Sequence, residues 1–219
     1  MPHASPRPSS RRRLLGLLGL ALALCGTPAD AGDALADALA AGRLQAWQQL
    51  LEQGGDDERA LLERVNRFVN RSVQHGEDQD IWGQADYWAT PQETLGRGRG
   101  DCEDIAIAKY FGLVRLGVPS ERLRLTFVKS LEQQRAHMVL AYYGDERAEP
   151  LILDNLRAQI LPAGQRGDLL PVYAFNNHGI FFGSAPQRRS KQTPQLLSRW
   201  QDVNARTLAE AGAPADLAI

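Results

Sequence analysis

The sequence has very little cysteine, with only Cys25 and Cys102 among 219 residues. Cys25 lies in an N-terminal segment that we expect to be cleaved off, so the mature chain would keep Cys102 alone. A single cysteine cannot form a disulfide within its own chain, which excludes a disulfide-stabilised framework. Cys102 is therefore expected to be a free thiol, which either packs as a small apolar side chain or acts as a nucleophile.

Long apolar runs and an excess of basic residues are also missing. The longest apolar stretch, residues 14–24, is too short and too interrupted for a membrane-spanning helix. It follows three arginines and precedes a small-x-small sequence at residues 29–31, and this order predicts a secretory signal over residues 1–31. Cys25 leaves a lipoprotein signal as an alternative, although Leu24 stands where a small residue is expected.

Cleavage would leave one domain, residues 32–219, which at 188 residues is long enough for a proper core. The signal carries four arginines and one aspartate, so its removal changes the formal net charge from −1 to −4. No basic stripe remains, which argues against a nucleic-acid partner. We also expect no stable membrane insertion, because the mature chain contains no further long apolar run.

Hydrophobic periodicity predicts helices in the first half of the mature chain and strands in much of the second. The expected helices are residues 33–53 with an interruption at Gly42, 57–74, 102–116 and about 194–211, whereas residues 76–100 are expected to be irregular. The expected strands are residues 123–129, 136–143, 150–156, 169–175 and 179–182. Helices followed by antiparallel strands indicate the α+β class.

The segment 102–116 is the clearest helix in the sequence. Asp101 can cap its N-terminus, with Asp104 three residues later. The helix is apolar nearly all round, which is typical of a helix that the rest of the domain wraps. Cys102 thus begins a central helix, a position where the helix dipole lowers the pKa of a thiol.

A thiol nucleophile needs a base, and a third group that orients the base. Of the four histidines, His137 opens an apolar strand, and Asp154 lies within the next strand, where an unpaired carboxylate is costly. Two registers of the intervening hairpin put both side chains on one face. If Ala141 pairs with Pro150 they are directly opposite, and if Tyr143 pairs with Pro150 they are diagonal.

Taken singly, Cys102 and His137 read as core residues and Asp154 as a strand-end cap or a surface ion pair. Together, a cysteine at a helix start followed by histidine and aspartate on neighbouring strands favours a catalytic triad. Four stretches surround these residues: DYWATP at 86–91, GDCED at 100–104, AHMVLAYY at 136–143 and LDNL at 153–156. In order and spacing they resemble the bacterial transglutaminase-like cysteine proteinases of the LapG type.

The resemblance implies a papain-like or transglutaminase-like fold, in which the nucleophile begins a central helix packed on an antiparallel sheet. It also implies a periplasmic protease that cuts a large surface adhesin near its N-terminus, at a pair of alanines, and so releases cells from a biofilm. An inner-membrane receptor that senses cyclic di-GMP would sequester the protease. Cys102 would attack the scissile carbonyl, His137 would carry the proton and Asp154 would hold the imidazole tautomer. Asn155 is a further polar candidate, and the backbone N–H of Cys102 would be an oxyanion donor.

Asp101, Glu103 and Asp104 place negative charge around the thiol. A carboxylate about 7 Å from the sulfur costs the thiolate roughly 2 kcal/mol at an effective dielectric constant of about 20. These acids either cap the helix and favour its dipole, or hold calcium, which prefers oxygen ligands. The residues alone leave both open. The resemblance implies a calcium ion held by Asp101, Glu103 and Asp104, with further ligands from residues 76–88.

Two other functions share these features, namely a transglutaminase-type acyl-transferase and a non-catalytic binding module with the same fold. The same triad passes an acyl group to an amine in the first, whereas the second has no need of all three residues. The aromatic residues Trp82, Tyr87 and Trp88 are expected to be core residues, with a wall for substrate as the alternative.

Overall fold

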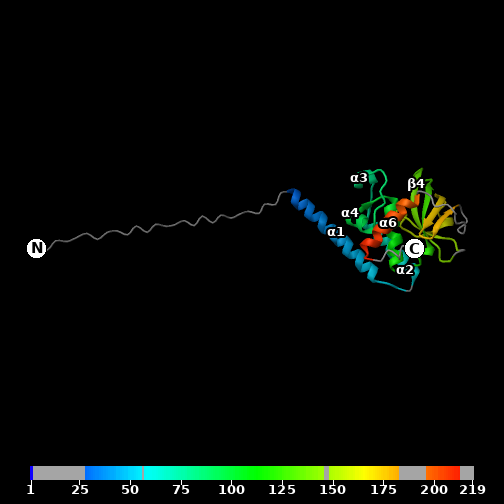
Figure 1. The fold of residues 1–219 in the computed structure, drawn as a ribbon, viewed down its shortest axis with the longest axis horizontal. Helices are drawn as coiled ribbons and strands as arrows, with labels where there is room; N and C mark the ends of the chain where they lie inside the picture. Colours follow the sequence, from blue (N-terminus) through cyan, green and yellow to red (C-terminus); the bar gives the residue numbers. More distant parts are fainter. Residues whose placement is uncertain (2–27, 56, 146–147, 183–195, 213–219) are drawn as a thin grey trace.

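The computed structural model describes residue 1 and residues 28–55, 57–145, 148–182 and 196–212. Most of the predicted secretory signal lies outside this part of the chain. Within it, no helix combines the length and apolar character needed to cross a bilayer. Helices pack against an antiparallel sheet, which confirms the predicted α+β class (Figure 1).

The described helices are α1 (Pro28–Glu52), α2 (Glu58–Ser72), α3 (Asp78–Trp82), α4 (Pro91–Arg97), α5 (Cys102–Arg115) and α6 (Leu196–Glu210), with 3-10 turns η1 (Ser120–Arg122) and η2 (Ala163–Gln165). The central helix α5 is confirmed, as is α2, each within about two residues of its predicted bounds. The helix α6 is confirmed and ends one residue before its predicted bound, whereas its predicted start at about residue 194 lies outside the described residues. Asp101 caps α5 as predicted, because its Oδ1 accepts the backbone N–H of Asp104 at 3.3 Å.

Two helix predictions are wrong in part. Gly42 does not interrupt α1, because an exposed glycine inside a helix costs only about 1 kcal/mol. Residues 76–100 are not irregular throughout, since they contain α3 and α4. The capping box of α4 was readable in the sequence: the Thr90 hydroxyl accepts the N–H of Glu93, the Glu93 carboxylate accepts the N–H of Thr90, and Pro91 fills the first helical position.

The strands are β1 (Gln74–His75), β2 (Arg99–Gly100), β3 (Leu123–Ser130), β4 (Arg135–Tyr142), β5 (Leu151–Leu153), β6 (Leu161–Pro162), β7 (Leu169–Asn176) and β8 (Gly179–Phe182). β1 and β2 form a small parallel pair, and the others form one antiparallel sheet in the order β6-β5-β4-β3-β7-β8. Leu140 pairs with Leu153, which is the register predicted to place His137 and Asp154 diagonally. Asp154 itself lies one residue beyond the end of β5 and not inside a strand.

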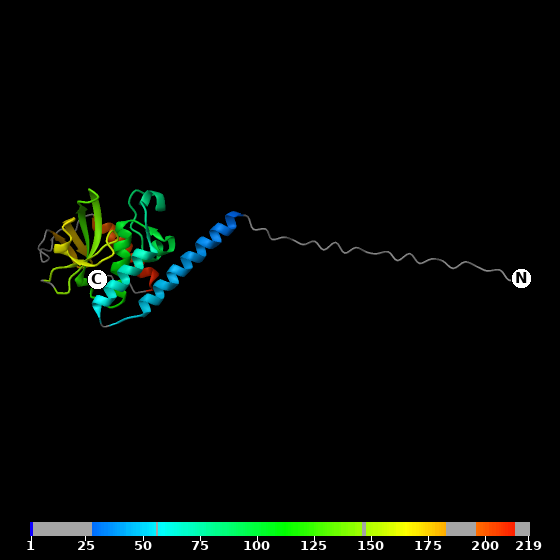
Figure 2. The same cartoon turned by 180° about the vertical axis from the view of Figure 1, so that it is seen from behind.

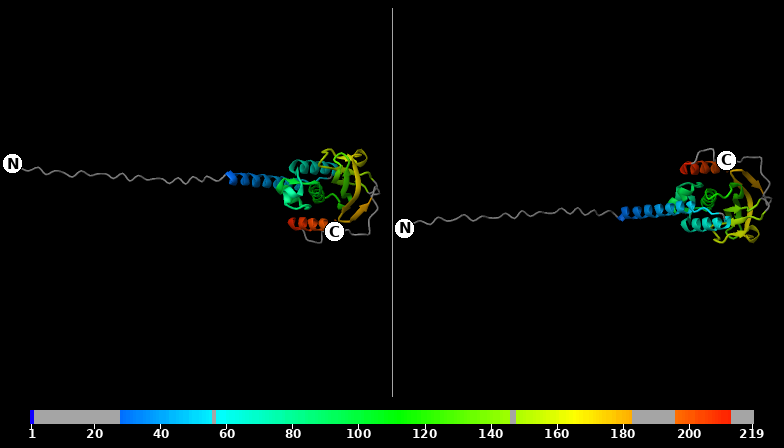
Figure 3. Two further views of the ribbon diagram at one scale, coloured as in Figure 1. Left: turned by 90° about the horizontal axis from the view of Figure 1, so that it is seen from above. Right: turned by 90° about the horizontal axis from the view of Figure 1, so that it is seen from below.

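The helix α5 lies against β3 and β4, and Figure 3 shows it between α2 and α6. Side chains of β3 and β4 alternate between the two faces of the sheet. Leu125 and Leu140 pack with α5 in the main core, whereas Val128 and Val139 belong to a second apolar cluster on the other face. The helix α5 is therefore surrounded by the sheet and the neighbouring helices, as its continuous apolar surface predicts.

The helix α1 packs on the domain through its C-terminal half. Trp47 is buried and stacks on Phe68 of α2, while Arg43 donates to the backbone oxygens of Leu95 and Gly96 at 2.7 and 2.8 Å. Residues 32–39 are exposed, and this half of the helix projects from the body (Figure 2).

The contact between α1 and α5 predicts a loss of stability in the variant Gly112→Ala. An added Cβ at this position of α5 would overlap Cη2 of Trp47. Overpacking of this kind costs about 1–3 kcal/mol, which outweighs the better helix propensity of alanine. Thermal unfolding should show a lower melting temperature. Gly96→Ala is the control, because a Cβ there meets nothing within 4 Å. Equal melting temperatures for the two variants would contradict the α1–α5 contact.

Candidate active site and acidic cluster

The thiol of Cys102 lies beside the edge of β4. Cys102 is half-buried, and its Sγ donates to Oε2 of Glu103 at 3.0 Å. The backbone N–H of Met138, the residue after His137, also contacts the sulfur. β5 pairs with β4 from Leu140 to Tyr142, so His137 and Met138 lie beyond this pairing. The topology thus brings the start of α5 and the start of β4 together.

The electrostatic conflict that the sequence predicts is present around the thiol. Burial raises the pKa of the Cys102 thiol, and the charges of Glu103 and Asp101 raise it further. The hydrogen bond to Glu103 acts in the same direction, and the Met138 contact opposes it. The thiol is therefore protonated in the surroundings that the protein alone supplies, with its hydrogen directed at Glu103.

His137 and Asp154 form a buried hydrogen-bonded pair. Nε2 of His137 lies 2.8 Å from Oδ1 of Asp154, and the exposed fractions of the two residues are 2% and 1%. His75 and His178 lie elsewhere, near Arg135 and Ser120. The structure thus joins two of the three residues predicted as a triad, and places the third at the adjacent helix start.

The carboxylate of Asp154 has more partners than the sequence indicated. Oδ1 also accepts the N–H of Leu156 at 3.0 Å, and Oδ2 accepts Nη2 of Arg166 at 2.7 Å. Burial alone would raise the pKa of Asp154, but the hydrogen bond and charge of His137, with Leu156 and Arg166, hold it below its usual value. Asp154 is therefore ionised at neutral pH, as the orienting member of a triad must be.

A cluster of five acids surrounds the start of α5. Carboxylate oxygens of Asp78, Asp101 and Asp104 lie within 4.8 Å of one another, and so do those of Asp78, Asp86 and Glu103. The sequence predicted Asp101, Glu103 and Asp104 as metal ligands and expected others from residues 76–88. Asp78 and Asp86 come from that segment, and the short helix α3 begins with Asp78.

The acidic cluster fits a hard cation such as calcium. Oδ1 of Asp78 and Oδ2 of Asp104 are buried without a hydrogen-bond partner, and unpaired buried carboxylates are costly. Burial and neighbouring acids raise the pKa of Asp101 to about 10. Burial, with the charges of Asp78 and Glu103, raises the pKa of Asp104 to about 7. A divalent cation with oxygen ligands would remove this repulsion.

The predicted aromatic residues fall into two places. Trp88 is buried and stacks on Phe175 in the core, with ring centroids 5.7 Å apart. Trp82, the last residue of α3, contacts Tyr87 in the segment that leads to α4, at a centroid distance of 4.8 Å. Asn155 is half-buried next to Asp154. Only Trp88 is therefore a core residue in the sense that the sequence predicted.

Comparison with known protein families identifies the family of this chain. A profile described as bacterial transglutaminase-like cysteine proteinase (BTLCP) matches residues 42–167. The chain belongs to the bacterial transglutaminase-like cysteine proteinases. The match includes Cys102, the His137–Asp154 pair and the acidic cluster. This BTLCP membership makes the protein a cysteine protease and confirms the predicted transglutaminase-like fold.

Solved structures of a cysteine proteinase of this type also resemble the chain. LapG of Legionella pneumophila is 38% identical, with a TM-score of 0.67, over 81% of this chain and 96% of that chain. Its EGTA-treated structure gives 37% identity and a TM-score of 0.69 over 81% and 96%. Its calcium-bound structure gives 39% identity and a TM-score of 0.67 over 81% and 97%. No curated protein matches the BTLCP chain. The comparisons favour an enzyme over a binding module.

Proposed function

We propose that this BTLCP protein is a calcium-dependent cysteine endopeptidase with the triad Cys102, His137 and Asp154. The observation that carries the proposal is the buried His137–Asp154 hydrogen bond, one residue from the Met138 N–H that contacts the free thiol of Cys102. Its proposed substrate is the N-terminal region of a large surface adhesin, cut at a pair of alanines, so that cells leave a biofilm. The LapG-type resemblance supports this substrate class.

The pair fixes which ring nitrogen serves the thiol. Because Asp154 is ionised, Nε2 of His137 carries a hydrogen and donates it to Oδ1. Nδ1 is then the basic nitrogen, which takes the proton of Cys102 as the sulfur adds to the scissile carbonyl carbon. The imidazolium gives this proton to the amine as the C–N bond breaks and the thioester remains. Water then adds to the thioester carbon while Nδ1 takes its proton, and the C–S bond breaks as the imidazolium returns that proton to Sγ. The backbone N–H of Cys102 is the proposed oxyanion donor.

We assign the calcium ion to the acidic cluster. Asp101, Glu103 and Asp104 are the predicted ligands, and Asp78 and Asp86 offer further carboxylates. When bound, calcium supplies positive charge that offsets the acids which oppose the thiolate. The calcium-bound structure of the similar LapG supports calcium as the ion, and the acidic cluster of this chain supports its place.

Incubation of the purified protein with an adhesin fragment containing an Ala-Ala pair tests the proposal. Mass spectrometry should find two new termini at one peptide bond, formed in the presence of calcium. The variant Cys102→Ala is the control and should leave the fragment intact. Cleavage by this variant would refute the thiol mechanism. A fluorescent amine in the same reaction separates the alternatives, because incorporation without cleavage would indicate a transglutaminase.

We further propose that the protein acts in the periplasm and that an inner-membrane receptor responding to cyclic di-GMP sequesters it. The support is the predicted secretory signal of residues 1–31 together with the LapG-type resemblance. Cell fractionation should recover the protein, shortened by this segment, in the periplasmic fraction. Recovery of the full-length chain in the cytoplasm would contradict both statements.

A further inference from the structure

We propose that Arg166 is a positioning residue of the triad, which holds the second oxygen of Asp154 so that the first stays aimed at His137. The inference rests on the proposed roles of Cys102, His137 and Asp154. It concerns a residue that the sequence did not single out and that touches neither the thiol nor a bound substrate in this proposal.

The two oxygens of Asp154 have separate sets of donors. Oδ1 accepts from His137 at 2.8 Å and from the N–H of Leu156 at 3.0 Å, whereas Oδ2 accepts from Nη2 of Arg166 at 2.7 Å. A carboxylate held on both sides cannot rotate about its Cβ–Cγ bond without breaking a charge-assisted hydrogen bond. The imidazole of His137 therefore meets an acceptor of fixed direction.

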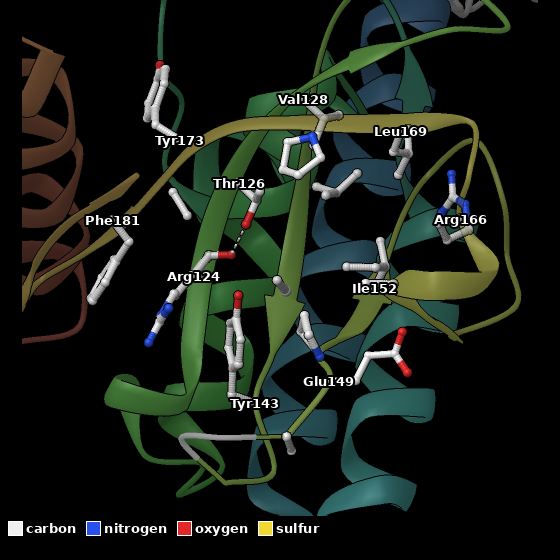
Figure 4. Close-up of a pocket in the computed structure, with 17 residues that line it drawn as sticks. Arg124, Thr126, Val128, Tyr143, Glu149, Ile152, Arg166, Leu169, Tyr173 and Phe181 are labelled. Carbon is white, nitrogen blue, oxygen red and sulfur yellow. Dashed lines mark hydrogen bonds between the residues drawn. The ribbon is translucent and has the colours of Figure 1, made fainter. Parts of the chain in front are cut away.

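Arg166 is itself held in place. Its Nε and Nη2 donate to the two oxygens of Asp168 at 2.9 and 2.8 Å, and only 2% of its surface is exposed. It follows the turn η2 and lines a cavity of about 440 Å³ on the face of the sheet away from α5 (Figure 4). Removal of the guanidinium would therefore take away a donor and open Asp154 toward this cavity.

Charge explains why an arginine suits this position. The groups that face Asp154 are His137 from β4, Lys109 from α5 and Arg166, and Asp168 neighbours the last of these. His137 exchanges its proton in each catalytic cycle. Burial lowers the pKa of Lys109 to about 7, so Lys109 is only partly charged at neutral pH. Arg166 keeps its charge at every working pH, so it is the constant counter-ion of Asp154.

The variants Arg166→Gln and Arg166→Lys test the proposal in the full protein. With the adhesin fragment, kcat should fall about 10- to 100-fold in Arg166→Gln with KM within about twofold, the size of effect known for residues that orient metal ligands by hydrogen bonds. The kcat of Arg166→Lys should lie between those of Arg166→Gln and the wild type, because lysine restores the positive charge but not the planar set of donors of the guanidinium. Arg157→Gln is the matched control, since Arg157 pairs with Glu132 at an exposed site.

Imidazole ¹⁵N NMR measures the tautomer of His137, which should not change if Arg166 only stabilises the fold. The wild type should show His137 as a single tautomer with hydrogen on Nε2, and Arg166→Gln should show exchange between tautomers. Wild-type kcat and tautomer in both Arg166 variants would overturn the proposal. Failure of both to fold would also overturn it, in favour of a structural role. If the wild type cuts no fragment, the proposed function fails, while the His137 spectra still decide whether Arg166 positions Asp154.

Discussion

Removing calcium with a chelator should abolish cleavage and lower the melting temperature at neutral pH. Without a cation, five acids meet at the start of α5, and two of their buried oxygens have no hydrogen-bond partner. A ligand at about 100 times its Kd stabilises a protein by about 2.7 kcal/mol. For a domain of this size that corresponds to a fall of about 5–10 °C on chelation. Differential scanning fluorimetry with EGTA, and then with excess calcium, measures this change in melting temperature.

The pH dependence gives this prediction a sign. Burial and nearby acids raise the pKa of Asp104 from 3.8 to about 7 and that of Asp101 to about 10, both above their unfolded values. The chelated, folded protein therefore binds more protons than the unfolded chain above about pH 4, and it loses stability as the pH rises. The pKa of Asp154 is lowered, so the stability that its ionised form contributes is lost only at pH values below about 4. Calcium should stabilise more at pH 8 than at pH 5.

The variant Asp78→Asn locates the ion. Asp78 is the one residue common to both groups of acids, so its loss should weaken calcium binding at least about tenfold, measured by isothermal titration. Asp80→Asn, an exposed position in the same helix α3, should bind calcium like the wild type. Equal affinities in the two variants would remove the cluster as the site. A larger effect of calcium at pH 5 than at pH 8 would contradict the electrostatic argument.

Local sequence signals predicted α5 well, because every part of the signal lies within the helix and its caps. Asp101 caps it, the apolar surface buries it, and both are properties of consecutive residues. For the hairpin between β4 and β5 the sequence left two registers, and the structure has the one that pairs Leu140 with Leu153. Gly42 misled the prediction because a glycine penalty is small beside the packing of Trp47 and the hydrogen bonds of Arg43, which no local pattern displays.

The site was predictable where chain order and hydrophobic pattern constrain it. Asp154 stood out as a charged residue in an apolar segment, and such a residue needs a partner. Asp78 and Arg166 did not stand out, because each lies in a polar stretch where an acid or a base is ordinary. Their roles follow from contacts across 26 and 12 residues of sequence, to Asp104 and Asp154 respectively. Only the folded chain shows which polar residues are buried together.

The same contacts make Asp154→Asn a severe test of the triad. Arg166 and the N–H of Leu156 can only donate, so the carboxylate accepts on both of its oxygens. Asparagine has one oxygen, and the charged guanidinium should attract it, which turns the NH₂ group toward His137. That group would donate to Nε2, and the hydrogen of the imidazole would move to Nδ1. The nitrogen that should receive the thiol proton would then already carry one.

We therefore expect kcat of Asp154→Asn to fall about 10⁴-fold, as in other triads that hold the wrong tautomer. The fold should persist at a lower melting temperature, because Arg166 keeps its two bonds to Asp168. Asp168→Asn is the matched control: it alters the partner of Arg166 without touching His137, so its effect on kcat should be far smaller. Single-turnover kinetics with the adhesin fragment measure the chemical step directly. A rate near that of the wild type in Asp154→Asn would mean that Asp154 only closes a strand end, and that His137 keeps its tautomer by another contact.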